Sequence, residues 1–436
     1  MSINIIGGGL AGCEAAYQVA KRGIKVNLYD MKPNKKSPAH HSDKLCELVC
    51  SNSLKAARKE SAAGMLKEEM RMLDSFLMKC ADKSKVPAGG ALAVDREIFS
   101  NLVNEEINSN PNITVINEEV TEIPDGITII ASGPLTSDLL SDKIKTMFGD
   151  SLSFYDAAAP IVKFDTVDMN KAFFASRYDK GDGDDYINCP MNKEEYDNFY
   201  EALVSAERAP VHDFDVMNPK VYEGCMPIEV MAQRGHDTIR FGPMKPVGLK
   251  DPRTGHRPWA VVQLRKENSA GIMYNLVGFQ TNLKFPEQKR VFSMIPGLEN
   301  AEFVRYGVMH RNTFIDSPRI LNSDYSVREN KNLFFAGQIT GVEGYMESAS
   351  SGLMAGINAA MRYIGEQTVT LPEYTMIGSL SRYISDETVS KFQPMGANLG
   401  VLPELEQRPR DKKERAKAYS DRSFAKLTEF INSRGL

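Results

Sequence analysis

The first thirty residues constrain the fold more than any other stretch of the sequence. A short apolar run, Ile3 to Ile6, leads into the glycine-rich turn Gly7-x-Gly9-x-x-Gly12. A segment of helical period follows from Leu10 to Arg22, and a second apolar run spans Ile24 to Tyr29. Strand, glycine turn, helix and second strand in this order are the fingerprint of a dinucleotide-binding β-α-β unit.

Each part of this fingerprint has a physical task. Gly7 allows the tight turn, Gly9 lets the backbone approach a pyrophosphate, and Gly12 lets the helix pack closely on the strand. The helix N-terminus offers free N–H groups and the positive end of its dipole to phosphates. Asp30, which ends the second strand, is placed to accept hydrogen bonds from a ribose. A glycine-rich turn without a ligand is the alternative, and the complete context argues against it. The residues expected to bind the cofactor here are Gly7, Gly8, Gly9, Leu10, Ala11, Gly12 and Asp30.

The composition is that of a large globular chain. Its 436 residues, 42% of them apolar, suffice for a large core in two domains, or in one domain with an insertion. The N-terminus enters a strand without a basic segment and an apolar signal core, and no run approaches the roughly 20 apolar residues of a membrane span. We therefore expect a soluble, cytoplasmic protein with no membrane partner.

Cysteine spacing and net charge exclude further classes of protein. The six cysteines include no C-x-x-C pair, so neither a disulfide framework nor a zinc site is indicated. We expect free thiols and no bound metal. The net charge is only −4, so an RNA partner would have to be held by a local basic surface.

Two stretches of the first third carry a structural prediction. Residues Ala62 to Met78 have the period of a single helix, with their leucine and methionine side chains on one face. The stretch from Val86 to Arg96 has a Gly-Gly pair between apolar arms. It is either a loop that admits a cofactor or a bulged hairpin.

A late segment again combines a predicted strand, glycines and a helix. Leu333 to Gly337 predicts a buried strand that ends in glycine, and a helix rich in alanine and serine is predicted from Glu347 to Met361. The glycines between and within these elements, Gly341, Gly344, Gly352 and Gly356, are expected to let a flat cofactor approach closely. Gly337 and Gln338 are the expected cofactor-binding residues, with Gln338 where many flavoproteins have an aspartate. A second full fingerprint is absent, which argues against a stable second site for NAD(P)H.

The middle of the chain has a different character. Between about Phe154 and Asn300, alternating stretches such as Ala260 to Leu264 and Met273 to Phe279 predict antiparallel strands, and Lys193 to Arg208 predicts a helix. The fold class is therefore α/β, a Rossmann-type nucleotide-binding domain with an α+β insertion domain. The expected boundaries are 1–153 and 301–436 for the two parts of the nucleotide-binding domain, and 154–300 for the insertion, which would contact the substrate.

The insertion is also rich in basic side chains, which would form a phosphate-facing surface if they share one face. They are Arg234, Arg240, Lys245, Arg253, His256, Arg257, Arg265, Lys266, Lys284, Lys289 and Arg290. A second basic run, Arg408 to Lys417, falls on a predicted helix. Ordinary solvated charges are the alternative for both groups.

Segments along nearly the whole chain resemble those of a single family. They are L-V-C-S-N-S-L (48 to 54), V-P-A-G-G-A-L-A-V-D-R (86 to 96), Y-D-A-A-A-P-I-V (155 to 162), N-C-P-M (188 to 191), F-G-P-M-K-P-V-G-L (241 to 249), V-V-Q-L-R (261 to 265), R-Y-G-V-M-H-R-N-T-F (305 to 314) and F-A-G-Q-I-T-G-V-E-G-Y (335 to 345). The chain is thereby identified as a member of the folate- and FAD-dependent tRNA (uracil-5-)-methyltransferases, the TrmFO family. The related GidA-type flavoproteins share the cofactor fold but lack the V-C-S-N-S and C-M-P-I-E contexts.

This resemblance implies the cofactor, the co-substrates and the target. FAD is the expected tightly bound cofactor, 5,10-methylenetetrahydrofolate the carbon donor, and NAD(P)H the reductant. The expected target is uridine 54 in the T-arm of tRNA, converted to 5-methyluridine.

The chemistry of uracil methylation calls for a thiol. C5 of uracil is a poor nucleophile until a group adds to C6, and a thiolate is well suited to that reversible addition. The resulting enolate attacks a one-carbon electrophile, a base removes the C5 proton, and hydride from reduced flavin completes the methyl group. The resemblance assigns Cys225, in E-G-C-M-P-I-E, as the nucleophile, and Cys50 as the thiol near the flavin that acts as base or handles the methylene group. Cys189 is expected to be structural.

Three alternatives stay open on the sequence. A GidA-like flavin oxidoreductase acting on a small molecule would share the fingerprint, although the cysteines in two distant polar contexts argue against it. An RNA-binding protein could keep FAD only as a structural or redox-sensing element. The same methylation chemistry could also act on a ribosomal RNA uridine.

Overall fold

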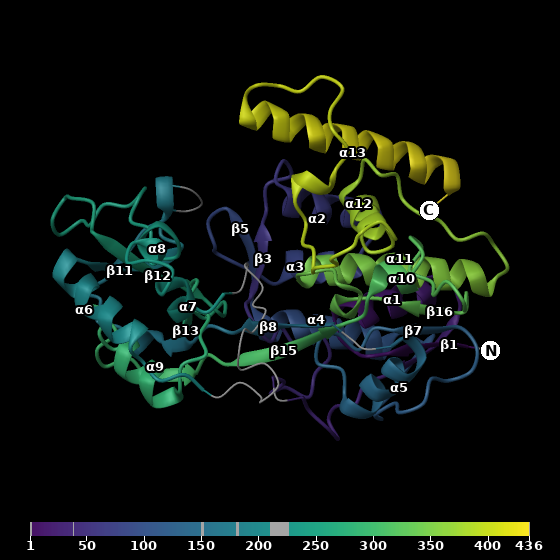
Figure 1. The fold of residues 1–436 in the computed structure, drawn as a ribbon, viewed down its shortest axis with the longest axis horizontal. Coiled ribbons are helices and arrows are strands. Elements are labelled where there is room, and N and C mark those ends of the chain that lie inside the picture. Colours follow the sequence, from purple (N-terminus) through teal and green to yellow (C-terminus); the bar gives the residue numbers. More distant parts are fainter. Residues whose placement is uncertain (1, 38, 150–151, 180–182, 210–225, 436) are drawn as a thin grey trace.

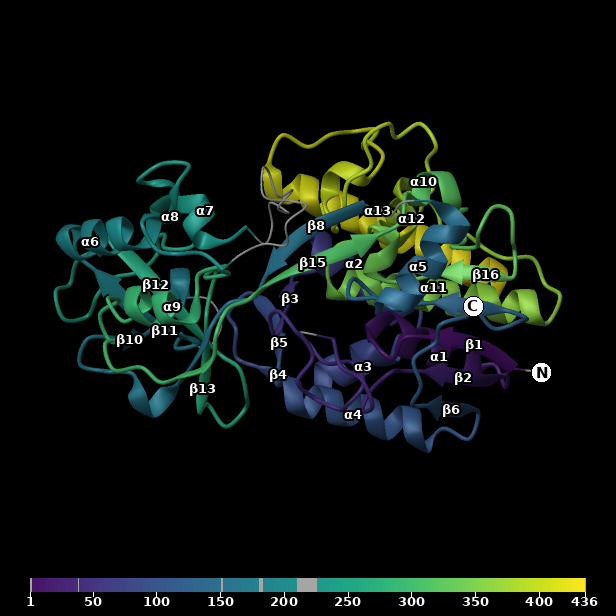
Figure 2. The same cartoon turned by 60° about the horizontal axis from the view of Figure 1, so that its bottom comes forward.

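The computed structural model describes residues 2–37, 39–149, 152–179, 183–209 and 226–435. Its elements form two lobes, which lie at the two ends of the long axis in Figure 1. A two-stranded ribbon, β8 (Leu152–Ala157) paired antiparallel with β15 (Met309–Phe314), runs between the lobes. Figure 2 shows this ribbon from a second direction. Both connections of the insertion therefore pass through a single pair of strands.

The larger lobe is built on a five-stranded parallel sheet in the order β16-β7-β1-β2-β6. The strands are β1 (Ser2–Ile6), β2 (Lys25–Tyr29), β6 (Ile113–Ile116), β7 (Thr128–Ile130) and β16 (Leu333–Phe335). They are short, and β1, β7 and β16 are almost entirely buried, as expected for strands that are covered on both faces. The β-α-β unit at the N-terminus is confirmed within one residue at each boundary of its strands and of helix α1 (Leu10–Lys21).

Two helices from opposite ends of the chain pack tightly beside this sheet. A Cβ added to Gly352, in α11 (Tyr345–Tyr363), would lie 2.1 Å from the carbonyl oxygen of Ala11 in α1. A Cβ added to Gly356 would lie 2.7 Å from the carbonyl oxygen of Ala15. These two glycines therefore allow the close approach of two helices. The expectation that they make room for a flat cofactor is wrong at these two positions.

The prediction of one continuous helix from Ala62 to Met78 is also wrong. The segment divides into α2 (Ala62–Met72) and α3 (Phe76–Lys83). Asp74 between them has a left-handed backbone, with φ 61°. Ser75 then caps α3, because its hydroxyl oxygen accepts a hydrogen bond from a backbone N–H of the first turn. The apolar period continues across the break, which is why the pattern alone does not reveal it.

The stretch from Val86 to Arg96 forms a hairpin in a small antiparallel sheet. Strand β5 (Ala91–Val94) pairs with β4 (Lys85–Val86) on one side and with β3 (Ser53–Ala56) on the other, with a register shift between β3 and β5. Of the two predictions made for this stretch, the hairpin is confirmed, but β4 and β5 pair without a bulge and the register shift lies between β5 and β3. The other helices of this lobe are α4 (Arg96–Ser109), α5 (Asp138–Phe148), α10 (Ser317–Ile320), α12 (Met376–Tyr383) and α13 (Lys412–Arg434).

The smaller lobe holds a six-stranded antiparallel sheet in the order β10-β11-β12-β13-β9-β14. Its strands are β9 (Ile161–Lys163), β10 (Phe173–Phe174), β11 (Tyr186–Met191), β12 (Ala260–Lys266), β13 (Met273–Leu276) and β14 (Phe303–Arg305). Its helices are α6 (Lys193–Val204), α7 (Ile228–Ala232), α8 (Thr238–Phe241) and α9 (Phe285–Phe292). One face of the sheet, with Ile187, Val262 and Leu276, belongs to a hydrophobic core.

Each lobe has its own core. One cluster of buried apolar residues draws on the segments 3–144 and 314–427, and the other on 162–301. The two clusters share no residue, and the domain boundaries near residues 153 and 300 stay a prediction. Within the described ranges, no helix combines the length and the apolar character that crossing a membrane requires.

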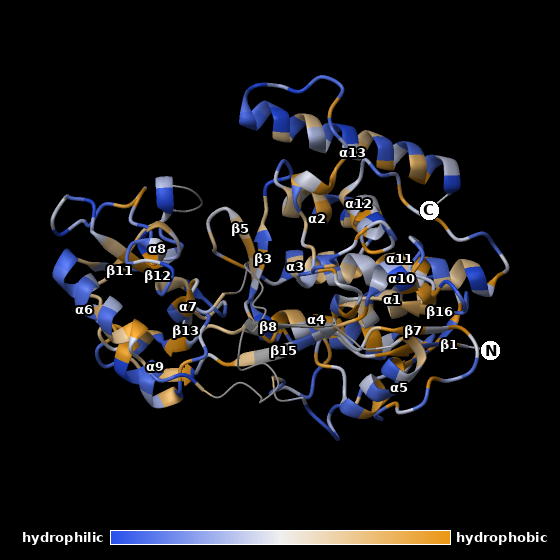
Figure 3. Ribbon diagram, viewed as in Figure 1, coloured by the Kyte–Doolittle hydropathy of each residue, from blue (hydrophilic) through white to orange (hydrophobic). Residues whose placement is uncertain are grey.

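The C-terminal helix α13 lies across the large lobe, and Figure 3 shows most of its turns as hydrophilic. Its contact with the lobe is partly polar. The buried carboxylate of Glu69, in α2, accepts hydrogen bonds from the hydroxyl of Ser423 in α13 (2.6 Å) and from the backbone N–H groups of Met376 and Ile377 in α12 (2.7 and 2.9 Å). Burial raises the pKa of Glu69 to about 7, although these three hydrogen bonds lower it.

Glu69 should make the stability of this packing depend on pH. The folded state holds the Glu69 proton more tightly than the unfolded chain does, so its contribution is largest below pH 4.5 and falls as the pH rises towards 7. The loss is on the order of 3 kcal/mol at most. Urea unfolding of wild type and Glu69→Gln between pH 5 and 8 measures this effect, because the glutamine cannot ionise. The free energy of unfolding of the wild type should fall relative to that of Glu69→Gln as the pH rises. Glu68→Gln, at the neighbouring position outside this contact, is the control and should keep the wild-type pH dependence; the same slope in Glu69→Gln would contradict the assignment.

Candidate active site

A large cavity opens at the carboxyl ends of the parallel strands, enclosing about 1110 Å³ including its open part. Its wall includes the glycine turn after β1, the end of β2, the turn after β7 and the start of the segment after β16. Of the residues expected to bind the cofactor, those that line the cavity are Gly7, Gly8, Gly9, Leu10, Ala11, Asp30, Gly337 and Gln338. Gly12 does not line it. A Cβ added to Gly12 would lie 1.8 Å from the carbonyl oxygen of Gly7, so this glycine serves the packing of helix on strand.

The start of α1 is suited to an anionic ligand. Gly9 is its N-cap residue and has no capping side chain, and the first turn contains no acidic residue. A Cβ added to Gly9 would meet no atom within 4 Å, which leaves free space in front of the helix N-terminus. Exposed N–H groups and the helix dipole favour a phosphate at such a place. The residues present therefore fit the pyrophosphate of a dinucleotide such as FAD.

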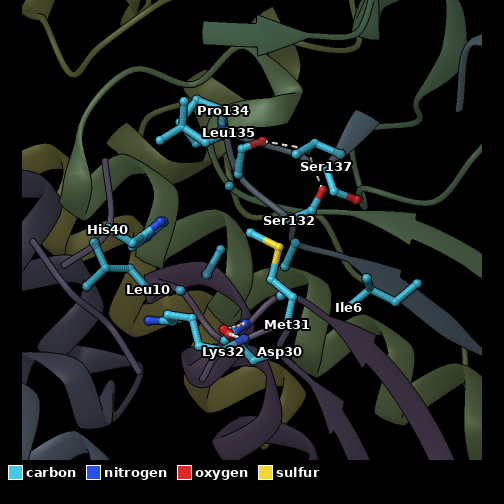
Figure 4. Close-up of a pocket in the computed structure, with 18 of the residues that line it drawn as sticks. Ile6, Leu10, Asp30, Met31, Lys32, His40, Ser132, Pro134, Leu135 and Ser137 are labelled. Atoms are coloured by element: carbon cyan, nitrogen blue, oxygen red, sulfur yellow. Dashed lines mark hydrogen bonds between the residues drawn. The ribbon is translucent and has the colours of Figure 1, made fainter. Parts of the chain in front are cut away.

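Asp30, which follows β2, braces the glycine turn from the side. Its carboxylate accepts hydrogen bonds from the backbone N–H groups of Gly8 (2.9 Å) and Lys32 (2.8 Å). In Figure 4, Asp30, Lys32 and His40 lie on one side of the cavity, with Ser132 and Ser137 on the other. Each carboxylate oxygen keeps a lone pair beyond these bonds. Asp30 thus fixes the glycine turn and can still accept from a ribose hydroxyl.

The late segment contributes a second group of contacts. The backbone N–H of Gly337 donates to the hydroxyl of Ser351 (2.6 Å), which ties the end of β16 to α11. The side-chain amide of Gln338 donates to Glu343 (2.5 Å) while Gln338 lines the cavity. Gln338, at the position where many flavoproteins have an aspartate, therefore contacts an acidic side chain through its amide.

Cys50 lies on a loop that three distant side chains hold in place. Arg96, at the start of α4, donates to the carbonyl oxygens of Leu48 and Cys50, the latter at 3.1 Å, and forms an ion pair with Glu267 (2.7 Å). Arg305, in β14, donates to the carbonyl oxygen of Val49 (2.7 Å). This loop makes no ladder with a neighbouring strand, so its carbonyl oxygens depend on these arginines.

Tyr345 holds the same loop from the other side. Its hydroxyl oxygen accepts hydrogen bonds from the backbone N–H groups of Cys50 (2.7 Å) and Ser51 (3.2 Å). Burial raises the pKa of Tyr345, and the nearby Cys50 raises it further. The phenol therefore stays neutral. Tyr345 also lines the large cavity.

The Cys50 loop separates two cavities. Val49 and Tyr345 line the large one. Cys50 and Ser51 line a smaller cavity of about 370 Å³ between the lobes, together with Ala159, Arg265, Asn275, Val277, Gly278 and Gln280. The thiol therefore stands next to the wall of the dinucleotide cavity but faces a second space.

Arg265 does not belong to the predicted basic surface. It is 6% exposed in β12, where it donates to the side chains of Asn52 (3.0 Å) and Ser51 (2.8 Å) across the boundary between the lobes. Several of the other basic residues are paired with acids instead of standing free. These pairs are Arg240–Asp237, Arg253–Asp251, Lys284–Glu207 and Arg290–Glu287. The basic run Arg408 to Lys417 lies partly before α13, which begins at Lys412.

The cysteines differ in environment. Cys225 lies outside the described residues. Ile228, three positions later, donates its backbone N–H to the carbonyl oxygen of Gln280 (2.7 Å), a residue of the small cavity. Cys189 is fully buried in the core of the small lobe, where burial raises its pKa to about 12, in agreement with a structural role. The five cysteines in the described ranges are free thiols.

Sequence reasoning missed four residues of this region. Arg96, Arg305 and Tyr345 hold the Cys50 loop, and Asn275 lines the small cavity. The first three are the first or last residue of a motif quoted for the family resemblance, which is the signal that could have found them. Asn275 lies in a strand with alternating burial and carries no such signal.

Comparison with known proteins agrees with this geometry. Residues 2–367 match the family model described as glucose inhibited division protein A. GidA of Aquifex aeolicus, in its form II crystal, superposes with a TM-score of 0.72 at 18% identity, covering 99% of this chain and 73% of that chain, which establishes the likeness in fold.

Curated relatives are much closer in sequence. The methylenetetrahydrofolate--tRNA-(uracil-5-)-methyltransferase TrmFO of Acetivibrio thermocellus is 61% identical over 432 residues, 99% of this chain and 98% of the relative. The TrmFO of Lysinibacillus sphaericus is 57% identical with the same coverage. This chain therefore belongs to the TrmFO family, within the broader group that the glucose inhibited division protein A model describes.

Proposed function

We propose that this protein methylates C5 of a uridine in tRNA, with 5,10-methylenetetrahydrofolate as carbon donor and FAD as bound cofactor. The observation that carries the proposal is the Cys50 loop, because it places a thiol between a dinucleotide-binding cavity and a second cavity that faces the other lobe. The names of the curated relatives, at 57 and 61% identity, favour tRNA over ribosomal RNA. Uridine 54 in the T-arm is the proposed target.

The cofactor supplies the hydride that converts the exocyclic methylene group to a methyl group. The chain's own residues hold the cofactor through the α1 N-terminus, Asp30 and the Gly337–Gln338 segment. NAD(P)H is the proposed external reductant. A cytoplasmic location belongs to the same proposal, since tRNA, folate and reduced nicotinamide are found together there.

Cys225 is the proposed nucleophile. Its thiolate adds to C6 of uracil, the C5–C6 electron pair moves to C5 and O4, and C5 forms the new bond to the one-carbon unit of the folate. Cys50 is proposed to act after this bond has formed, as the base that takes the C5 proton or as the thiol that handles the methylene group. The link between Ile228 and Gln280 supports a shared site, because Gln280 lines the cavity of Cys50.

The cofactor assignment can be tested at Gly9. The structure offers room for a larger side chain there, since an added Cβ meets no atom within 4 Å. Gly9→Val should therefore fold normally, and it should lose FAD because the valine fills the space of the pyrophosphate. Flavin absorbance per chain and circular dichroism measure the two effects. Gly90→Val is a matched control, with equally free space around its Cβ and a position outside the cavity. Full flavin occupancy in Gly9→Val would contradict the assignment.

The two cysteines should behave differently with RNA that contains 5-fluorouridine. Fluorine at C5 cannot leave as a cation, so a competent thiolate is trapped on C6. Cys225→Ala should bind FAD, lack methylation and form no covalent complex on a denaturing gel. Cys50→Ala should also lack methylation but still form the complex through Cys225.

The reverse pattern would exchange the two roles. Cys189→Ala serves as the control, because its buried thiol takes no part in either step. It should form the complex and retain methylation in whatever fraction of the protein remains folded.

A further inference from the structure

The small cavity between the lobes has a polar wall built from adjacent strands. Arg265 in β12 and Asn275 in β13 are direct cross-strand partners, so their side chains lie side by side on one face of the sheet. This face points away from the core of the small lobe, whose side chains alternate with them along both strands. The cavity that Arg265 and Asn275 line is about one third the size of the dinucleotide cavity (370 against 1110 Å³).

Other polar side chains on this face satisfy one another. Arg177 donates to Gln263 (2.8 Å), and Gln263 donates to Asn188 (2.9 Å). Asn188 donates in turn to the carbonyl oxygen of Ala175 (2.9 Å). A buried amide in this sheet can therefore find partners within the protein.

Asn275 is different. It is 3% exposed, and its Nδ2 has no hydrogen-bond partner among the described residues. A buried amide without a partner costs free energy comparable to the loss of a hydrogen bond, and the great majority of such groups in proteins are satisfied. A ligand in the cavity that Asn275 lines would supply the missing partner.

The positive charge of Arg265 is the second feature of this wall that a ligand could satisfy. In the described part of the chain no carboxylate forms an ion pair with it, and its two hydrogen-bond partners, Asn52 and Ser51, are neutral. Burial lowers the pKa of Arg265, and the nearby charge of Glu267 offsets this only in part. A buried cation is stabilised by a negative charge close by, and its cost is high without one. A ligand on which negative charge develops would fit this position.

Together these two side chains describe the chemistry of the ligand. The amide of Asn275 can donate and accept at the same edge, which suits a ring that presents an N–H beside a carbonyl oxygen. Arg265 suits a carbonyl oxygen that becomes negative during the reaction. A single uracil ring meets both requirements, at its N3–H and O4.

We propose that this cavity receives the target uracil ring, with Asn275 binding its N3–H and O4 edge and Arg265 stabilising the charge on O4. This inference rests on the proposed function and adds two residues to it. When the thiolate adds to C6, the sulfur supplies the electron pair of the new S–C6 bond, and the C5–C6 π pair shifts so that C4–O4 becomes an enolate. Arg265 donates to that oxygen. The charge returns to C5 as the bond to the one-carbon unit forms, and no further reactant is needed for this step.

Asn275→Ala is the informative variant, because the Nδ2 that it removes has no hydrogen-bond partner among the described residues. Holoenzyme carrying it should keep its FAD and a melting temperature equal to or above that of the wild type. Its rate of covalent complex formation with a T-arm hairpin containing 5-fluorouridine, measured without folate, should fall about tenfold or more, as expected for a lost buried hydrogen bond. The KM for RNA should rise while the KM for methylenetetrahydrofolate stays unchanged.

Asn188→Ala is the matched control on the same face of the sheet. It removes hydrogen bonds that the protein makes to itself, so the melting temperature should fall, while complex formation per folded molecule stays at the wild-type rate. Arg265→Lys keeps a cation but not the planar fork, so it should also slow complex formation. Since Arg265 anchors Asn52 and Ser51, the Asn275 variant decides the test.

Each remaining outcome overturns a stated part. A lower melting temperature with unchanged complex formation in Asn275→Ala would mean that the amide is a structural group satisfied by water. A raised KM for methylenetetrahydrofolate with unchanged complex formation would assign the cavity to the pterin ring instead of uracil. Failure of the wild type itself to form the complex or to methylate RNA would reject the proposed function. The wild-type reaction alone thus separates this outcome from a failure of the uracil-binding proposal.

Discussion

The carbonyl oxygens of residues 48–50 are the groups on which the arrangement of the candidate site depends. They lie in a loop between the lobes, where no neighbouring strand can pair with them. Arg96 and Arg305 donate the hydrogen bonds to these oxygens, and the hydroxyl oxygen of Tyr345 accepts from the backbone N–H groups of Cys50 and Ser51. The three side chains come from widely separated parts of the sequence. The loop can therefore take this shape only after the parallel sheet, α11 and the small lobe have come together.

This arrangement concentrates positive charge around a short stretch of backbone. Arg96 is compensated by Glu267, whereas Arg265 and Arg305 have neutral hydrogen-bond partners among the described residues. Burial lowers the pKa of both Arg265 and Arg305. Charges held in this way are poor for stability, because desolvation is only partly offset by polar contacts. Their presence on both sides of Cys50 is understandable if the reaction itself brings negative charge into the space between them.

The outcome of sequence reasoning depended on whether a feature is local. The β-α-β unit was predictable nearly to the residue, because its glycines, its helical period and its strand ends all lie within one short segment. The break at Asp74 was not, since Leu73 and Leu77 keep the apolar period while the backbone turns. The serine that caps α3 was the only local sign of it. Arg265 was misplaced on the surface because nothing in its own strand reveals that Asn52, more than 200 residues earlier, lies against it.

The paired strands β8 and β15 have a consequence for how such a molecule can be assembled. Ala157 and Met309 face each other across the ribbon, so the chain leaves the large lobe and returns to it at neighbouring positions. A segment whose two ends lie this close is a self-contained module, and a short hairpin turn would close the same ribbon without it. The lobe with the parallel sheet can thus be regarded as a complete scaffold, into which the small lobe is inserted at a single point. Exchange of that module would change the residues that face the large lobe, and the parallel sheet would stay the same.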